Sequence, residues 1–295
     1  MPLPLIKQLS VQNELGEGIQ WHALSQSLWW TDIHNSKLYS YSPSADQISV
    51  FHMPDRVGCF AFTPTKSVLI VAFAKGIARY HLETKEITWL SKPEQHNPGN
   101  RFNDGRVDRN GSFWAGTLVE DAKQSIENAK LYQLNQDLTY SPRLTNIQIS
   151  NGLCFSPNGE LVYHADSPTR SIYRYEITAS GDLTAKTRLA ITPEGVYPDG
   201  ACIDVNGNLW SAQWGGGRVV QYSSTGEILS QVDIPVAQPS CVAIGGPNMD
   251  WLCVTSAREG LSQNTLEQQK SAGDVFIYQL PAPIGLEESL CTTLL

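Results

Sequence analysis

The sequence lacks any apolar run near the roughly 20 residues that a membrane-spanning helix requires. Its first residues, MPLPLIKQLS, lack the charged and apolar regions of an export signal. Basic residues are also few, since 21 Lys and Arg stand against 29 Asp and Glu, for a net charge of −8. An electrostatic field of this sign does not attract phosphate backbones or anionic membranes. We therefore expect a cytoplasmic protein with no nucleic-acid partner and no membrane partner.

The sequence also lacks the cysteine spacing of a zinc site. No CxxC pair and no Cys/His zinc spacing occur among its six cysteines. Four of them lie in apolar, strand-like runs, namely GCFAF, GLCFS, GACID and SCVAI. Because free cysteine is among the most often buried residue types, we expect buried thiols rather than disulfides.

Helical periodicity of useful length is nearly absent. Only residues 119–129 and 262–270 look helical or irregular, which excludes a parallel α/β fold. Strand-like runs instead recur at intervals of about 40 to 49 residues, and six such repeats account for the chain. The runs are Leu28-Trp29-Trp30, Val68-Leu69-Ile70, Ser112-Phe113-Trp114, Leu161-Val162-Tyr163, Leu209-Trp210 and Asp250-Trp251-Leu252.

Each repeat contains several strand patterns. A second alternating segment follows each run, as in KLYSY, SIYRY and DVFIY, and a third follows most of these. A further short strand precedes the run in most repeats, as in NGLCFSPNG. Four-stranded antiparallel units repeated radially form a propeller. The sequence therefore predicts an all-β fold, a six-bladed β-propeller of four-stranded antiparallel blades around a central channel, with residues 1–295 as a single domain.

A ring of blades has to close without leaving a long unpaired strand edge. The apolar segment LPLIKQLSV at residues 3–11 is placed to add a strand to the last repeat. We therefore expect this segment to close the ring. No exposed apolar stretch is identifiable in the sequence, so we expect a monomer or a weak homodimer.

One position in the first strand of each repeat is expected to face the channel. Asn-Gly and Asp-Gly pairs usually mark turns, so any one of them alone would indicate a turn. Their common register favours a shared site in the channel instead, because buried polar groups need partners. Four of the six positions carry side-chain oxygens of Glu, Asn or Asp. The positions are Glu17, Gly58, Asn103, Asn151, Asp199 and Ser240.

The four polar positions supply two carboxylates and two amides, without histidine or thiolate. This oxygen-rich set suits hard cations such as Ca²⁺, Mg²⁺ or Mn²⁺ more than a structural zinc. Glu17 and Asp199 would neutralise a doubly charged ion, and so few protein ligands leave coordination positions for water and substrate. We therefore expect one divalent metal ion in a catalytic role, with Ca²⁺, Mg²⁺, Mn²⁺, Zn²⁺ and Fe²⁺ as the candidates.

Seven motifs, spread from about residue 14 to about residue 260, carry a resemblance to a known family. They are GEGIQW, WWTDI, NRFNDGRVDRNGSFWAGT, SNGLCFS, YHADS, PDGACIDVNGNLW and GGGRV. Together they resemble the SMP-30/gluconolactonase/LRE family, to which sugar lactonases and regucalcins belong. The resemblance implies a six-bladed propeller with one metal ion in its channel and a small-molecule sugar lactone as substrate.

The resemblance also implies roles for individual residues. The family's metal ligands match Glu17, Asn151 and Asp199, and its sugar-contacting Arg and Asn match Arg101 and Asn103. A further carboxylate that contacts substrate in some members follows the AGT motif, where this chain has GTLVED. Either Glu120 or Asp121 fills this role, and Asp121, at the family position, is one methylene shorter.

The mechanistic hypothesis is hydrolysis of a sugar lactone to the aldonic acid. The metal polarises the lactone carbonyl, and Asp199 acts as the general base toward the attacking water. Two alternatives remain open at this point. One is a related propeller esterase or organophosphatase, and the other is a calcium-binding regulatory or scaffold propeller without catalysis.

Overall fold

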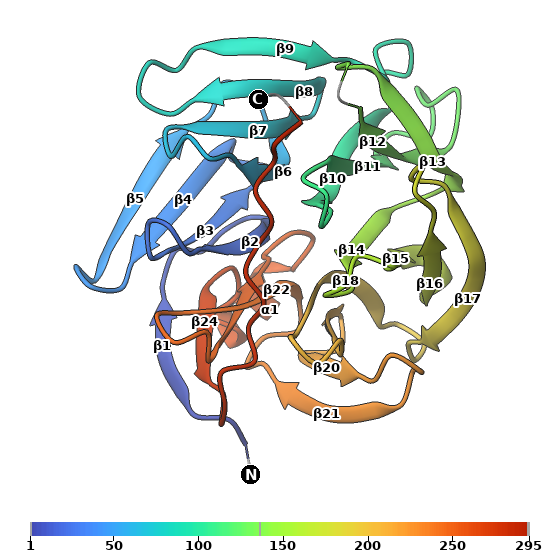
Figure 1. Cartoon of the computed structure of the whole chain (residues 1–295). Helices are drawn as coiled ribbons and strands as arrows, with labels where there is room; N and C mark the ends of the chain where they lie inside the picture. The colour runs from blue at the N-terminus through green and yellow to red at the C-terminus, as the bar shows by residue number, and fades with distance from the viewer. Residues whose placement is uncertain (1, 136, 294–295) are drawn as a thin grey trace.

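The computed structural model describes residues 2–135 and 137–293. Six four-stranded sheets surround a central channel, and the strands of each sheet pair antiparallel (Figure 1). The predicted six-bladed β-propeller is confirmed. The first three blades contain β2 (Gly16–His22), β3 (Ser27–Asp32), β4 (Lys37–Ser42) and β5 (Gln47–His52); β6 (Val57–Phe62), β7 (Val68–Phe73), β8 (Gly76–His81) and β9 (Ile87–Ser91); and β10 (Asn100–Val107), β11 (Phe113–Val119), β12 (Ala129–Leu134) and β13 (Tyr140–Ile147).

The other blades follow the same meander, with one strand drawn from the N-terminal end of the chain. Two short helical segments lie outside the sheets. The remaining elements are β14 (Ser150–Phe155), β15 (Leu161–Asp166), η1 (Ser167–Thr169), β16 (Ser171–Ile177) and β17 (Leu183–Ile191); β18 (Tyr197–Ile203), β19 (Leu209–Trp214), β20 (Arg218–Tyr222) and β21 (Ile228–Asp233); and β22 (Pro239–Gly245), β23 (Trp251–Ser256), α1 (Gln263–Gln268), β24 (Val275–Gln279) and β1 (Leu5–Leu9).

The ring closes through its first strand. The sheet order β1-β24-β23-β22 places β1 on the outer edge of the sixth blade, with Leu9 opposite Val275. The predicted closure by residues 3–11 is therefore confirmed. Pairing the two ends of the chain in one sheet leaves every blade with four strands, which protects the ladder edges.

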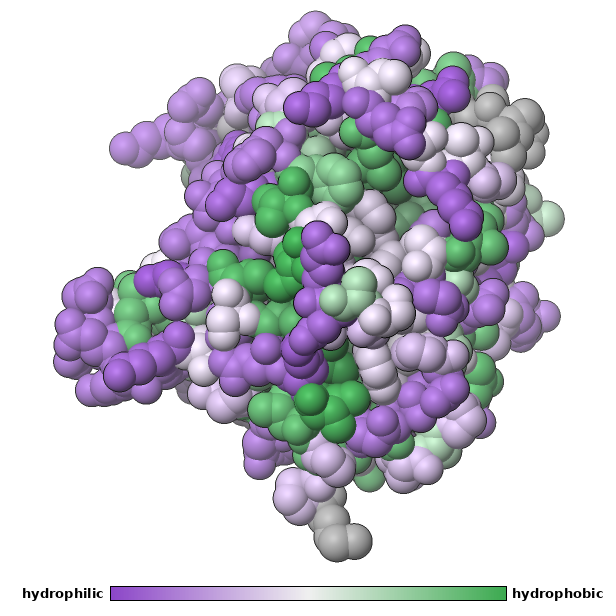
Figure 2. All heavy atoms as spheres, turned by 90° about the vertical axis from the view of Figure 1, so that its left-hand side faces the viewer, coloured by the Kyte–Doolittle hydropathy of each residue, from purple (hydrophilic) through white to green (hydrophobic). Residues whose placement is uncertain are grey.

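Burial falls from the channel outward within a blade. Every residue of the inner strands β2 and β6 is buried, whereas the outer strand β5 is mostly exposed. Neighbouring blades pack face to face, as where Trp30 of the first blade and Ile277 of the sixth share one core cluster. Figure 2 shows the side on which β5 lies, and hydrophilic residues cover most of it.

The C-terminal segment, residues 281–293, crosses the centre of the ring in Figure 1. Val205, just after β18, donates its backbone N–H to the Ile284 carbonyl at 2.9 Å. Cys291 donates its backbone N–H to the carbonyl of Phe62, the last residue of β6, at 2.7 Å. These contacts lie where inner strands end. The segment therefore covers the end of the channel at which the inner strands finish.

The six cysteines are free and buried, as predicted. Burial raises the pKa of each thiol, as at Cys59 and Cys241 in the inner strands. The helix α1 falls within the segment expected to be helical or irregular, and residues 120–128 form turns and irregular backbone. In the described part of the chain, no helix has the length and apolar character needed to cross a membrane.

Candidate metal and substrate site

Every blade has an irregularity at the position predicted to face the channel. In the first blade the ladder between β2 and β3 shifts register between Glu17 and Gln20, and in the fifth the shift falls between Pro198 and Ala201. Equivalent shifts occur in the other four blades. A bulge bends its strand and redirects side chains, here toward the axis. The common register is confirmed, and the Asp199-Gly200 pair lies inside a strand rather than in a turn.

Glycine next to the bulge allows neighbouring inner strands to approach closely. A Cβ atom added at Gly200 would lie 2.4 Å from the Sγ atom of Cys241 on β22. Only glycine fits at this distance from a buried neighbour. The glycine that follows Asp199 is therefore required by packing between two blades.

A cavity of about 490 Å³ opens at the end of the channel where the inner strands begin. This volume lies within the usual range for small-molecule sites. The cavity brings together six of the seven predicted site residues, all except Asp121. Its lining consists of Leu15, Glu17, Arg101, Asn103, Leu118, Glu120, Ile149, Asn151, Ser167, Pro168, Tyr197, Asp199, Trp214 and Glu259.

The carboxyl groups of Glu17 and Asp199 lie in hydrogen-bonding contact with each other. Both side chains are buried, and one Glu17 oxygen accepts the Gly18 N–H at 3.0 Å. Burial raises the pKa of Glu17, and repulsion from the nearby Asp104 adds to the effect. Burial also raises the pKa of Asp199, with repulsion from Glu17 as the next cause. A cation between the two groups would remove the repulsion, so this pair fits a divalent ion.

Hydrogen bonds fix the orientation of the Asn151 amide. Its Nδ2 donates to the Ser167 hydroxyl at 2.8 Å, and that hydroxyl donates to the Pro198 carbonyl at 2.7 Å. Its Oδ1 accepts from Asn103 Nδ2 at 2.8 Å. No group of three or more His, Cys, Asp or Glu among the described residues is arranged to hold a metal. An ion would therefore need amide oxygen beside the two carboxylates, a donor set that suits hard cations.

Arg101 lies at the centre of a chain of polar contacts along the cavity wall. Its Nη1 donates to Asn103 Oδ1 at 2.9 Å and to the Phe102 carbonyl at 2.9 Å. Its Nε donates to Glu120 at 2.9 Å, and Arg56 holds the same carboxylate with two further bonds of 2.5 and 2.8 Å. The hydrogen bond from Arg56 is the main reason that the pKa of Glu120 falls to about 2. Glu120 is therefore an ionised hydrogen-bond acceptor at the cavity.

Asp121 lies outside the lining of the cavity. One of its carboxylate oxygens accepts the Lys123 N–H at 2.9 Å, and the other accepts from Gln124 Nε2 at 2.7 Å. Such contacts stabilise a turn. Of the two acidic residues predicted as candidates, Glu120 therefore lies with the other site residues at the cavity, whereas Asp121 belongs to the adjacent loop.

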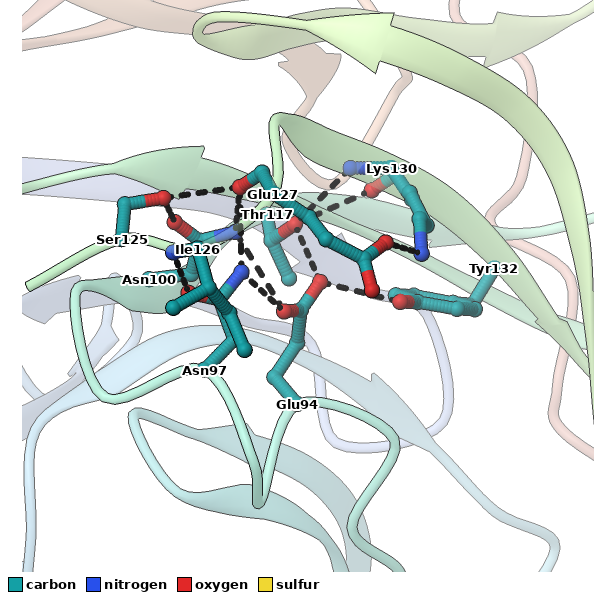
Figure 3. A network of polar contacts seen from close by, with 9 residues as sticks. All are labelled: Glu94, Asn97, Asn100, Thr117, Ser125, Ile126, Glu127, Lys130 and Tyr132. Atoms are coloured by element: carbon teal, nitrogen blue, oxygen red, sulfur yellow. Dashed lines mark hydrogen bonds and ion pairs between the residues drawn. The ribbon is translucent and has the colours of Figure 1, made fainter. Parts of the chain in front are cut away.

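A polar network around Glu94 holds the segments that carry Arg101 and Glu120 (Figure 3). One Glu94 oxygen accepts from the hydroxyls of Thr117 and Tyr132, at 3.1 and 2.9 Å. Its other oxygen accepts from two asparagine amides, Asn97 Nδ2 at 3.1 Å and Asn100 Nδ2 at 3.3 Å. The network joins the loop before β10 to strands β11 and β12. Four donors on one carboxylate make this a strongly hydrogen-bonded anchor.

Several cavity residues escaped the sequence reasoning. Ser167 lies in the YHADS motif, and its small side chain gave no chemical signal of its own. Tyr197 and Trp214 lie at the facing ends of β18 and β19, so their places follow from the strand boundaries. Glu259 lies in an irregular loop after β23 and had no periodic signal.

The fold and the cavity define a six-bladed β-propeller with an oxygen-rich pocket at one end of its channel. Residues 15–258 match the SMP-30/Gluconolactonase/LRE-like region. The chain belongs to this family, which confirms the resemblance seen in its motifs. Three relatives illustrate how much of the chain is shared.

L-arabinolactonase of Azospirillum brasilense is 37% identical over 91% of this chain and 89% of its own. The 6-deoxy-6-sulfogluconolactonase of Pseudomonas putida is 33% identical over 97% of each chain. Among solved structures, a calcium-binding protein, regucalcin, from Agrobacterium tumefaciens superposes with a TM-score of 0.89 at 27% identity, covering 98% of both chains. The similarity therefore extends over the whole propeller.

Proposed function

We propose that this chain hydrolyses a sugar lactone to the aldonic acid in the channel cavity. The observation that carries the proposal is the contact between the Glu17 and Asp199 carboxyl groups, in a cavity that also contains Arg101 and two amides. Two relatives matched over nearly the whole chain are named L-arabinolactonase and 6-deoxy-6-sulfogluconolactonase, and they support this class of substrate.

Glu17, Asn151 and Asp199 would hold one divalent cation. When bound, the ion would supply Lewis acidity toward the lactone carbonyl. Its positive charge would also keep both carboxylates ionised despite their burial. The oxygen donors favour a hard cation such as Ca²⁺, Mg²⁺ or Mn²⁺ over Zn²⁺ or Fe²⁺.

Asp199 is the proposed general base. It would accept a proton from water as the water oxygen bonds to the lactone carbonyl carbon. The ring C–O bond then breaks, and the protonated Asp199 returns a proton to the departing ring oxygen. The products balance as one lactone and one water giving one hydroxy acid. Burial of Asp199 places the proton transfer in a site from which bulk water is largely excluded.

Arg101, Asn103 and Glu120 would orient the sugar hydroxyls. The guanidinium of Arg101 offers donors, whereas the ionised Glu120 offers acceptors. Glu120 is proposed for this role in place of Asp121, because Glu120 lines the cavity and Asp121 does not. Their contribution is to hold the carbonyl in reach of Asp199.

Part of the cavity lining is apolar. Pro168, Tyr197 and Trp214 contribute hydrophobic and aromatic surface to it. Such surface accommodates the C–H face of a sugar ring while the polar lining residues bind its hydroxyls. A pocket with both kinds of surface fits a polyhydroxylated ring better than a wholly apolar aryl ester.

A pH-drop assay over a panel of aldonolactones tests the proposal. The panel consists of the arabinono-, xylono-, galactono- and gluconolactones, with an aryl ester and an organophosphate as comparison substrates. We expect at least one aldonolactone to be hydrolysed far faster than either comparison substrate. Turnover of the comparison substrates alone would instead favour the related esterase or organophosphatase. Calcium binding without any turnover would favour the regulatory propeller.

The proposed setting of this activity is the cytoplasm. Six free, buried thiols without a disulfide fit a reducing compartment. We further propose that the protein acts as a monomer or a weak homodimer, since all cavity residues come from one chain.

A further inference from the structure

Glu259 is an acidic residue at the cavity that the proposed mechanism does not use. It lies in the loop after β23 and is fixed at three points. Its backbone N–H donates to the Glu14 carbonyl at 3.0 Å, and its own carbonyl accepts from Gln238 Nε2 at 3.0 Å. Its Oε1 is 2.8 Å from Nε2 of His34, a residue in the turn after β3. This anchoring holds a loop carboxylate in one place.

The Glu259 carboxylate is ionised and partly free. The hydrogen bond with His34 holds the pKa of Glu259 below its ordinary value. A carboxylate can only accept, so the His34 nitrogen is the donor in this bond. Among the described residues, none donates a hydrogen bond to the other oxygen, Oε2. A lone pair at the cavity is therefore available to a ligand.

The charges around the cavity are unequal. Four carboxylates line it, and Arg101 is the one basic side chain in the lining that the described residues form. Arg101 and Arg56 already neutralise Glu120, and a divalent cation would neutralise Glu17 and Asp199. Glu259 is in direct contact with His34 only, and Arg101 attracts it from a distance without donating a hydrogen bond to it. Of the four carboxylates, Glu259 is thus the one with neither an arginine nor the proposed cation in direct contact.

We propose that Glu259 is a specificity-determining residue, which accepts a hydrogen bond from a hydroxyl of a neutral lactone and disfavours lactones with an anionic substituent. This inference rests on the proposed lactonase function. A hydroxyl satisfies the free carboxylate oxygen, whereas a second carboxylate there brings like charges together without a donor. Discrimination by such repulsion is electrostatic and weakens as salt screens it.

Two substrates that differ at one group provide the test. D-Glucono-1,4-lactone has a hydroxymethyl group where D-glucaro-1,4-lactone has a carboxylate. We expect the wild-type kcat/KM for the neutral lactone to exceed that for the anionic one by about tenfold or more. Glu259→Gln keeps the shape and an acceptor oxygen but removes the charge, and should narrow this ratio about tenfold. High salt should also lower the wild-type ratio of kcat/KM for the neutral lactone to kcat/KM for the anionic one. This measurement tests electrostatic repulsion without any variant.

Glu194→Gln is the matched control. Glu194 is exposed in the loop that leads to Tyr197 and is absent from the cavity lining, so its removal should leave the ratio unchanged. Equal wild-type rates on both lactones, or a ratio that neither Glu259→Gln nor salt alters, overturn this inference and leave the proposed function standing. A wild-type protein that hydrolyses no aldonolactone overturns the proposed function and this inference together.

Discussion

The Glu17 and Asp199 carboxyl groups, on the inner strands of the first and fifth blades, contact each other inside the channel. Burial raises the pKa of each group, so in the metal-free protein protons occupy the pair well above the ordinary carboxyl pKa. Protonation of this pair should therefore affect both metal binding and the stability of the folded protein. Two of its consequences can be measured directly.

Metal binding should release protons. A cation needs ionised carboxylates, so it displaces the protons that Glu17 and Asp199 hold when the metal is absent. Apparent metal affinity should therefore rise with pH above the ordinary glutamate pKa of 4.5. Calorimetric titrations with Mn²⁺ or Ca²⁺ in buffers of different ionisation enthalpy measure the protons released. Metal binding that releases no proton in weakly acidic solution would show that the pair is already ionised.

The metal-free protein should lose stability as pH rises. The pKa values of both carboxyl groups are higher in the folded than in the unfolded state. The stability that the protonated pair contributes is therefore fully present below the unfolded-state pKa, near 4, and is lost as pH rises through the folded-state pKa values. Saturating metal should remove this loss. Urea denaturation across the pH range, with and without metal, measures both curves. Parallel curves would argue against a raised pKa at this pair.

Asp199→Asn should abolish most turnover without unfolding the propeller. The amide keeps the shape of the side chain but cannot take a proton, so kcat should fall by about a hundredfold to ten-thousandfold. Asp233→Asn, at the exposed end of β21, is a matched surface control that should keep wild-type activity. Near-normal kcat in Asp199→Asn would remove this residue from the base role.

Arg101→Lys should weaken substrate binding more than the chemical step. A lysine ammonium cannot contact Glu120, Asn103 and a sugar hydroxyl in the fork geometry of a guanidinium. KM should rise about tenfold to a hundredfold, at unchanged metal affinity. Arg56→Lys is the comparison, because Arg56 contacts Glu120 from outside the cavity, and its effect on KM should be smaller. Equal effects of the two variants would mean that Arg101 acts only through Glu120.

Glu94→Gln should loosen the loops shown in Figure 3. The new amide brings its own donors to a position that receives four donors, so at least one contact is lost. KM should rise several-fold, and residues 120–128 should exchange amide hydrogens faster. Glu86→Gln, at an exposed site in the preceding blade, controls for charge removal. Unchanged amide hydrogen exchange in residues 120–128 would mean that the Glu94 network does not hold this loop in place.

The C-terminal segment provides a stability test. Oε1 of Glu288 lies 3.2 Å from Nη1 of Arg106, and both side chains are largely shielded from solvent. Glu288→Gln leaves a buried guanidinium without its countercharge and should lower the free energy of unfolding by about 3 kcal/mol. Glu287→Gln, one residue earlier and exposed, should have little effect. Similar urea midpoints for both variants would mean that the segment lies more loosely over the channel.

The repeated features of the fold were predictable from sequence. The same strand pattern recurs in each of the six repeats, so a strand that is ambiguous in one repeat can be identified from its equivalents in the other five. The same repetition places Glu17, Asn151 and Asp199 at one common position of the repeat, which is visible in the sequence alone. Closure by residues 3–11 followed from the need to pair an edge strand.

Features without periodicity were not predictable. Which of Glu120 and Asp121 enters the cavity depends on the backbone beyond the end of β11, where strand alternation no longer applies. Glu259 depends on a loop anchored to Glu14 and Gln238, which are distant in sequence. The path of residues 281–293 over the channel likewise depends on contacts with several blades rather than on a local pattern.

In the proposed mechanism, Glu17, Asn151 and Asp199 hold one divalent cation on which hydrolysis depends. The most direct test titrates metal into the exhaustively chelated protein and follows binding by calorimetry and lactone hydrolysis by pH drop in parallel. We expect one cation per chain, activity that returns in proportion to metal occupancy, and weakened metal binding in Glu17→Gln with an unchanged circular dichroism spectrum. Full activity in the chelated protein, or unaltered metal affinity in Glu17→Gln, would contradict it.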